Sequence, residues 1–231
     1  MTPAYRRRIS IRPGPGVVDA EMEDYPHHFS LHIEHRDGVV TKAGATGHRI
    51  PWTSCATGAA GLRLLAGTTL TDAVDLNAWA PDRTTQCVHV ADLALLAVRH
   101  ALDDAPITYE ARITPGDAVE RHAVLRADGV VVLDWHVDGD LVAELGVTLA
   151  RRPFFDHLAA SGVTGDALEH AVVLRRACHI GRSRGIDLDA FATAADIHDP
   201  DGSCFTYRAD VAVTARRVRG TMKPTEQEGA D

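Results

Sequence analysis

A short segment near the start of the chain combines a strand pattern with a cluster of histidines. Residues 27–35 read His-His-Phe-Ser-Leu-His-Ile-Glu-His. With a period of two, Phe29, Leu31 and Ile33 form the apolar face of a β-strand. The opposite face then carries His28, Ser30, His32 and Glu34. Histidine titrates near neutral pH, so this row could transfer protons, bind a metal or simply face solvent.

The next residues predict that this strand pairs with its successor. Arg36-Asp37-Gly38 separates it from a second alternating run at 39–45. An Asp-Gly pair between two such runs is a strong hairpin signal. The same pattern predicts further strands at 7–12, 17–22, 107–114, 120–126, 130–137 and 141–149.

Other stretches have helical spacing. In the clearest helix, 87–103, one apolar stripe runs along the helix and Pro106 follows its end. Thr53-Ser54 is a cap for a helix at 55–66 that Gly67 closes. Further helices are predicted at 154–160, 166–180 and 204–218.

Hairpins kept apart from helices indicate an α+β fold, with an antiparallel sheet and segregated helices. The length of 231 residues suits one domain of ordinary size. We expect a single domain over 1–222, with 107–150 as a divergent hairpin insertion within it. Residues 223–231 are expected to form a polar tail.

Composition narrows the class of partner. The net charge of −8 and the isoelectric point near 5.9 argue against a nucleic-acid binder. No run of 18 apolar residues occurs, and no apolar core follows the first arginines. We therefore expect a cytoplasmic protein that contacts neither nucleic acid nor a membrane and acts on a small molecule. The sequence leaves open whether the protein forms a homo-oligomer.

The chain also lacks familiar cofactor and metal motifs. Its cysteines, at 55, 87, 178 and 204, form no Cys-x-x-Cys pair. Neither a Gly-rich phosphate loop nor a His-Glu-x-x-His pair is present. The Gly-x-Ser-x-Gly run at 181–185 follows a predicted helix and not a strand, so it does not predict a nucleophile elbow. We therefore predict neither a cofactor nor a metal, and reduced, packed cysteines.

Two segments concentrate groups that transfer protons. Residues 23–28 hold two carboxylates, a phenol and two imidazoles, including Asp24, Tyr25 and His28. The alternative is an acidic turn before a strand. Residues 86–92 place Cys87, His89 and Asp92 at a predicted helix start, which favours a thiolate.

Within that helix, His89 and Asp92 share a face. Cys87 and His89 are two residues apart, so they are poorly placed to pair, and Cys87 is more readily a packed residue.

A third segment, 47–55, offers groups for binding a substrate. Arg49 could hold a carboxylate or phenolate with two hydrogen bonds. Trp52 could stack on an aromatic ring, although a tryptophan that seals the core is the favoured interpretation.

These segments carry a family resemblance. Residues 86–93, Gln-Cys-Val-His-Val-Ala-Asp-Leu, resemble a Cys-Thr-His-Leu motif that enters a helix in a bacterial family known as domain of unknown function 2889. Valine replaces the threonine here. The likeness covers residues 6–103 well and 200–220 loosely, and residues 107–199 match little. The other matching pieces are 6–12, 16–24, 51–55, 64–67 and 204–209.

The resemblance implies a role in the bacterial breakdown of aromatic compounds. It suggests a cofactor-independent lyase that releases formaldehyde from a lignin-derived phenylcoumaran dimer and leaves a stilbene. Such chemistry needs a base, an acid and an apolar slot for the aromatic substrate.

Two other classes stay open: a non-catalytic binding protein for an aromatic molecule, and a metal-dependent enzyme using the His-rich strand. For the lyase, we expect the site where the histidine face of 27–35 meets the start of helix 87–103. The catalytic residues would be Asp24, Tyr25, His28, His32 and His89. The substrate-binding residues would be Arg49, Trp52, Cys87 and Asp92.

Overall fold

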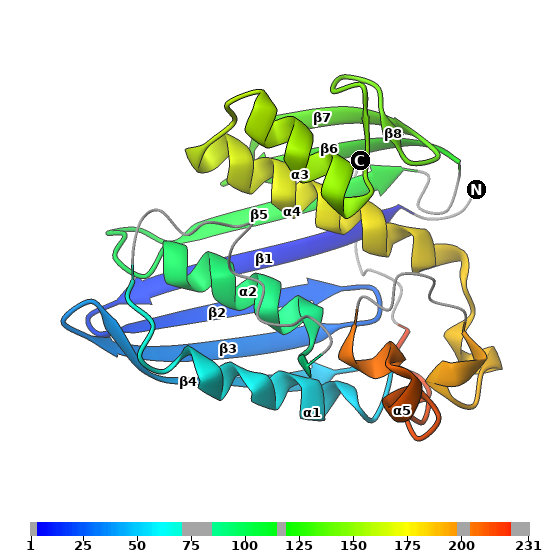
Figure 1. Ribbon diagram of the computed structural model, residues 1–231, viewed down its shortest axis with the longest axis horizontal. Coiled ribbons are helices and arrows are strands. Elements are labelled where there is room, and N and C mark those ends of the chain that lie inside the picture. Colours follow the sequence, from blue (N-terminus) through cyan, green and yellow to red (C-terminus); the bar gives the residue numbers. More distant parts are fainter. Residues whose placement is uncertain (1–3, 71–84, 115–118, 198–203, 223–231) are drawn as a thin grey trace. The chain divides into compact units, whose positions relative to one another are not determined.

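The computed structural model describes residues 4–70, 85–114, 119–197 and 204–222 (Figure 1). Its strands form one antiparallel sheet in the order β4-β3-β2-β1-β5-β6-β7-β8-β9. The expected polar tail, 223–231, lies outside the described residues. The strands are β1 (Tyr5–Gly14), β2 (Val17–Asp24), β3 (His28–Arg36), β4 (Val39–Arg49), β5 (Ile107–Thr114), β6 (Glu120–Ala127), β7 (Val130–Asp138), β8 (Leu141–Val142) and β9 (Val147–Thr148).

The helices follow blocks of strands and do not alternate with them, so the predicted α+β class is confirmed. The α-helices are α1 (Cys55–Ala59), α2 (Val88–Arg99), α3 (Arg151–Ala160), α4 (Gly165–Gly181) and α5 (Ala209–Ala212). Short 3₁₀ helices are η1 (Ala60–Leu65), η3 (Arg182–Gly185), η4 (Leu188–Ala190), η5 (Ala194–Asp196) and η6 (Phe205–Tyr207). None of the helices in the described ranges is long and apolar enough to cross a membrane.

Contacts divide the chain into two compact units. The large unit comprises Ile9–Ile107 and Asp187–Pro224, and the small unit comprises Met1–Arg8, Thr108–Ile186 and Thr225–Asp231. The boundary after residue 107 coincides with the start of the expected insertion. The small unit, however, continues through α3 and α4. That residues 1–222 form a single domain stays a prediction.

The predicted hairpin at 28–45 is confirmed in the large unit. β3 pairs antiparallel with β4, and Asp37 and Gly38 have φ values of 51° and 74°. Two successive positive φ values are typical of the tight turn whose twist matches that of paired strands. Phe29, Leu31 and Ile33 are at most 2% exposed, as the period of two predicts.

Helix α2 covers this apolar face by packing against β2 and β3 (Figure 1). Its predicted stripe is buried, and includes Val90, Leu93, Ala94 and Ala97. Burial of each large apolar side chain contributes about 1.5–3 kcal/mol, so the stripe determines which way the helix faces. This packing places the start of α2 next to the turn that joins β2 to β3.

The small unit repeats the strand-turn-strand scheme. Asp128 and Gly129 have φ values of 47° and 81° and join β6 to β7. Helix α4 packs on these two strands, and Trp135 and Phe154 meet edge to face in the core. The strand predicted over 141–149 is wrong as one piece. It divides into β8 and β9, which pair with each other across a turn containing Gly146 at φ 63°.

Two helix predictions in the large unit also need correction. The helix expected at 204–218 is replaced by η6 and the four-residue α5, and Arg216 and Arg217 then form isolated β-bridges. The bridge from Arg217 reaches Trp52. The helix expected at 55–66 is a single α-helical turn followed by η1. In the 204–218 segment, tertiary pairing outweighs local helical spacing.

Candidate active site

The connection between β2 and β3 forms a tight, internally bonded turn around Asp24 and His27. The Asp24 amide donates to the His27 carbonyl at 2.9 Å. The carboxylate Oδ1 of Asp24 accepts the His27 amide at 2.9 Å and lies 2.9 Å from His27 Nδ1. Asp24 is 1% exposed and His27 is 8% exposed. A buried carboxylate thus holds one nitrogen of a nearly buried imidazole.

Arg49 holds this turn from outside. Its Nη2 donates to the carbonyl oxygens of Asp24 at 2.5 Å and His27 at 3.1 Å, and its Nη1 donates to Glu23 at 3.0 Å. The Arg49 side chain is 10% exposed. Arg49 was expected to bind a substrate anion. The structure gives its guanidinium three contacts with the protein instead, which makes it a support for the site.

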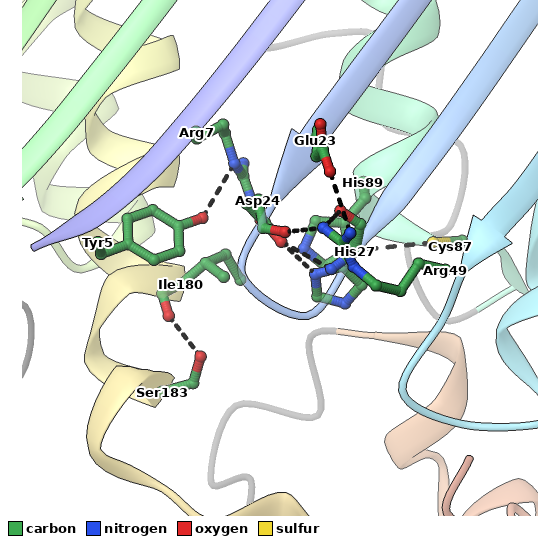
Figure 2. Close-up of polar contacts among 10 residues, drawn as sticks. All are labelled: Tyr5, Arg7, Glu23, Asp24, His27, Arg49, Cys87, His89, Ile180 and Ser183. Carbon is green, nitrogen blue, oxygen red and sulfur yellow. Dashed lines mark hydrogen bonds and ion pairs between the residues drawn. The ribbon is translucent and has the colours of Figure 1, made fainter. Parts of the chain in front are cut away.

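His89 reaches the same turn from α2 (Figure 2). Its ring centroid lies 3.9 Å from that of His27, with the planes tilted by 33°. Phe29 flanks both imidazoles, with centroid distances of 6.1 Å to His27 and 6.3 Å to His89. His89 is 6% exposed. Two imidazoles and one carboxylate therefore lie together in a buried region, where electrostatic interactions are stronger than in water.

Cys87 adds a thiol to this group. It caps α2 in an extended conformation, with φ −66° and ψ 117°, so the helix begins one residue later than predicted. Its Sγ lies 4.0 Å from His89 Nδ1, so the two groups are close although their spacing in the sequence placed them poorly for pairing. Burial, with Cys204 and Cys55 nearby, raises the pKa of Cys87 well above 9.0. The group is a thiol, and the expected thiolate is not supported.

The hydrogen bonds assign a proton arrangement to His27. An ionised Asp24 carboxylate can only accept, and in that state Nδ1 of His27 carries the hydrogen and Nε2 keeps its lone pair. A carboxylate that orients an imidazole also stabilises the imidazolium formed when that imidazole takes a proton. His27 is therefore arranged to act as a base.

Asp24, His27 and His89 are also the one group in the described ranges with donor types and spacing that could suit a metal ion. One ligand atom from each lies within 4.8 Å of the others. Imidazole nitrogen and carboxylate oxygen are common ligands of zinc and iron. Any metal test should therefore address this group and not the outer face of β3.

The other predicted histidines lie elsewhere. His28 and His32 point to the face of the sheet opposite α2, where Glu21 Oε1 is 2.6 Å from His28 Nε2 and Asp19 Oδ1 is 2.7 Å from His32 Nδ1. Their side chains are 27% and 49% exposed. The expected junction of this histidine face with the helix start is wrong, because α2 covers the apolar face.

The remaining predicted residues also differ in whether they lie near this turn. Tyr25 lies within the turn and is partly buried, and Asp92 is partly buried one helical turn after His89. Trp52 is 1% exposed, donates to the Tyr207 hydroxyl at 3.3 Å and packs beneath Arg217. Trp52 therefore seals the core, as favoured from the sequence.

The sequence analysis did not include His27 among the expected catalytic residues, although the period-two pattern shows on which face it lies. Counting in twos from Phe29 places His27 on the buried face and His28 on the other. Burial, and after it the nearby Cys204, raises the pKa of both Cys55 and Cys87, and this grouping of thiols had no sequence signal. Cys204 comes from a segment more than 100 residues away from the other two.

Comparison with protein-family models and with curated proteins finds no match. The resemblance described above therefore stays a prediction.

The close contact behind Cys87 gives a prediction for stability. A Cβ on Gly58 would lie 2.9 Å from the Cys87 backbone nitrogen. We expect Gly58→Ala to lower the free energy of unfolding by about 1–3 kcal/mol, because backbone must move to admit the methyl group. Urea unfolding measures the change. Gly44→Ala, whose Cβ would meet nothing within 4 Å, is the control, and equal losses in both would contradict this packing.

The face of the sheet opposite α2 gives a prediction for the pKa of a carboxyl group. The hydrogen bond from His28 is the largest cause that lowers the Glu21 pKa below 4.5. A carboxylate with a depressed folded-state pKa adds stability above its unfolded pKa and loses it as the pH falls through the folded value. We expect His28→Ala to raise the Glu21 pKa toward 4.5. Carboxyl NMR titration of both proteins measures this, and an unchanged value would refute the pairing.

Proposed function

We propose that this protein is a cofactor-independent lyase that breaks a carbon–carbon bond by acid–base chemistry at Asp24, His27 and His89. One observation carries the proposal: a buried carboxylate orients one imidazole, and a second imidazole lies 3.9 Å from it. A base and an acid that touch each other suit a reaction that moves one proton between two atoms of a substrate.

The family resemblance supplies the substrate class, a phenylcoumaran-type aromatic dimer with a primary alcohol. In the proposed reaction, His27 Nε2 takes the alcohol proton. The C–O bond becomes the carbonyl of formaldehyde as the neighbouring C–C bond breaks. The released electron pair forms the stilbene double bond and expels the ring oxygen as an aryl oxide.

His89 then donates a proton to the aryl oxide. The substrate loses one proton and gains one, so no external oxidant or reductant is required. Proton transfer from His27 to His89 restores the starting state, and one ring nitrogen of each lies within 4.8 Å of the other. The imidazolium on His27 is stabilised meanwhile by Asp24. Tyr25, partly buried in the same turn, is the proposed contact for the phenolic part of the substrate.

Arg49 has a supporting role in this scheme. By holding the carbonyls of Asp24 and His27, it fixes the turn that orients the base. The proposal places the enzyme in the cytoplasm, where the free thiols of Cys55, Cys87 and Cys178 would stay reduced.

The test is incubation of the purified protein with a phenylcoumaran dimer that carries the primary alcohol. Stilbene absorbance and formaldehyde are measured in parallel, in untreated and chelator-treated protein. We expect equal amounts of the two products and no effect of chelation. A protein that binds the dimer without turnover would be a binding protein. Activity lost on chelation and restored by zinc or iron would replace acid–base chemistry with a metal-dependent reaction.

A further inference from the structure

We propose that a cleft at the turn end of the β3–β4 hairpin binds a small organic carboxylate that carries an apolar group. The cleft belongs to the large unit and has a volume of about 770 Å³. Its walls come from the β1–β2 turn, the β3–β4 turn and Leu102, which follows α2. These segments lie at the end of β2 and β3 opposite the turn that holds Asp24 and His27 (Figure 1). The inference therefore concerns a second site and does not depend on the proposed function.

Arg36 supplies the positive charge of this cleft. It is the last residue of β3, it is exposed, and it lines the cleft. In the part of the chain that the structure describes, its guanidinium forms no ion pair. The nearby carboxylate of Glu34 lies 2.8 Å from Lys42 Nζ and is engaged there. A guanidinium binds a carboxylate through two parallel hydrogen bonds, so Arg36 is available to a ligand of that kind.

His35 is the second polar group in the wall, and its hydrogen bonding is incomplete. The register of β3 and β4 shifts between Glu34 and His35, and such irregularities change the direction of a side chain. The His35 amide donates to the Gly16 carbonyl at 2.9 Å, which holds the β1–β2 turn beside it. Nε2 of His35 is buried and has no hydrogen-bond partner among the described residues. Buried polar groups are nearly always bonded, so we infer that a rotation of this ring lets it donate to a ligand oxygen.

Leu102 gives the cleft an apolar wall. Its side chain is 55% exposed, and contact with an apolar part of a ligand would remove that surface from water. Asp37 is exposed and also lines the cleft, where it would attract an ammonium group. A guanidinium, an imidazole and an apolar surface together recognise a carboxylate with an apolar group, and Asp37 extends that class to amino acids.

The experiment titrates the full-length protein with benzoate, with phenylalanine and with benzylamine, which lacks a carboxylate. Calorimetry measures affinity, and NMR of labelled arginine and histidine side chains locates the binding. The variants are Arg36→Gln and His35→Phe. Arg12→Gln is the control for charge, because Arg12 is an exposed arginine of β1 outside this cleft. His32→Gln is the control for the imidazole, because His32 lines the cleft but has its Nδ1 2.7 Å from Asp19.

We expect saturable binding of benzoate or phenylalanine, with shifted signals from Arg36 and His35. Arg36→Gln should weaken binding at least about tenfold and His35→Phe about threefold, because each removes a hydrogen bond to the carboxylate. Both controls should stay within about twofold of wild type. A preference for phenylalanine that Asp37→Asn removes would support the site and identify its ligand as an amino acid.

Three results would overturn the inference. They are the absence of saturable binding by either carboxylate, equal weakening in Arg36→Gln and Arg12→Gln, and benzylamine binding as tight as that of benzoate. If His35→Phe does not fold, the comparison of Arg36→Gln with Arg12→Gln decides, since both residues are exposed.

Discussion

Replacing His89 by glutamine is expected to lower turnover of the aromatic dimer at least about a hundredfold while the protein stays folded. Glutamine keeps a polar side chain of similar length but cannot exchange a proton near neutral pH. The ring centroids of His89 and His27 lie 3.9 Å apart, and the change removes the group proposed to return the proton to the departing oxygen. Steady-state formaldehyde release, with circular dichroism as the check on folding, measures the effect.

The matched control for this variant is His100→Gln. His100 caps the other end of α2, is 7% exposed, and places its Nδ1 2.6 Å from Asp103. It is a nearly buried histidine of the same helix with a carboxylate partner but no contact with His27 among the described interactions. We expect turnover within about threefold of wild type. Equal losses in both variants would show that α2 packing, and not His89 chemistry, was disturbed.

Replacing Asp24 by asparagine should cause the second large loss, about a hundredfold or more in turnover. The amide oxygen can still accept the His27 amide hydrogen, but the neutral side chain no longer stabilises the imidazolium on His27. The amide group can also turn its NH₂ toward Nδ1, which would reverse the His27 tautomer. Turnover and the His27 nitrogen-15 spectrum test both consequences.

Glu23→Gln is the control for Asp24→Asn. Glu23 is the preceding residue, is exposed, and pairs with Arg49 at 3.0 Å without touching either imidazole in the described contacts. We expect a change of less than about threefold, as for an exposed ion pair. Wild-type turnover in Asp24→Asn would show that His27 needs no carboxylate partner, and would remove the orienting role assigned to Asp24.

Local patterns were sufficient for much of the large unit's fold. The Asp37-Gly38 turn, the alternation of Phe29, Leu31 and Ile33, and the apolar stripe of α2 each depend on neighbours in sequence. Such patterns are strong because burial requires one face of every strand and helix to be apolar. The segments around 204–218 were mispredicted because their pairing with Trp52 and Thr193 is long-range.

The candidate site was only half predictable for the same reason. Asp24 and His89 were identified by their chemistry, but the choice of His28 over His27 selected the histidine on the face of the sheet opposite α2. Period-two parity would have corrected that choice. The contact between Cys87 and His89 depends on where α2 begins, and a shift of one residue decides it. Boundaries of this kind are set by capping and packing and are only weakly marked in the sequence.

The most direct test compares His27→Gln with His28→Gln under one assay. The two histidines are adjacent in sequence, but His27 is 8% exposed and bonded to Asp24, whereas His28 lies on the opposite face beside Glu21. Formaldehyde release from the dimer should fall at least about a hundredfold in His27→Gln and stay within about threefold of wild type in His28→Gln. The reverse order, or equal rates in two folded variants, would contradict the assignment of the active site to Asp24, His27 and His89.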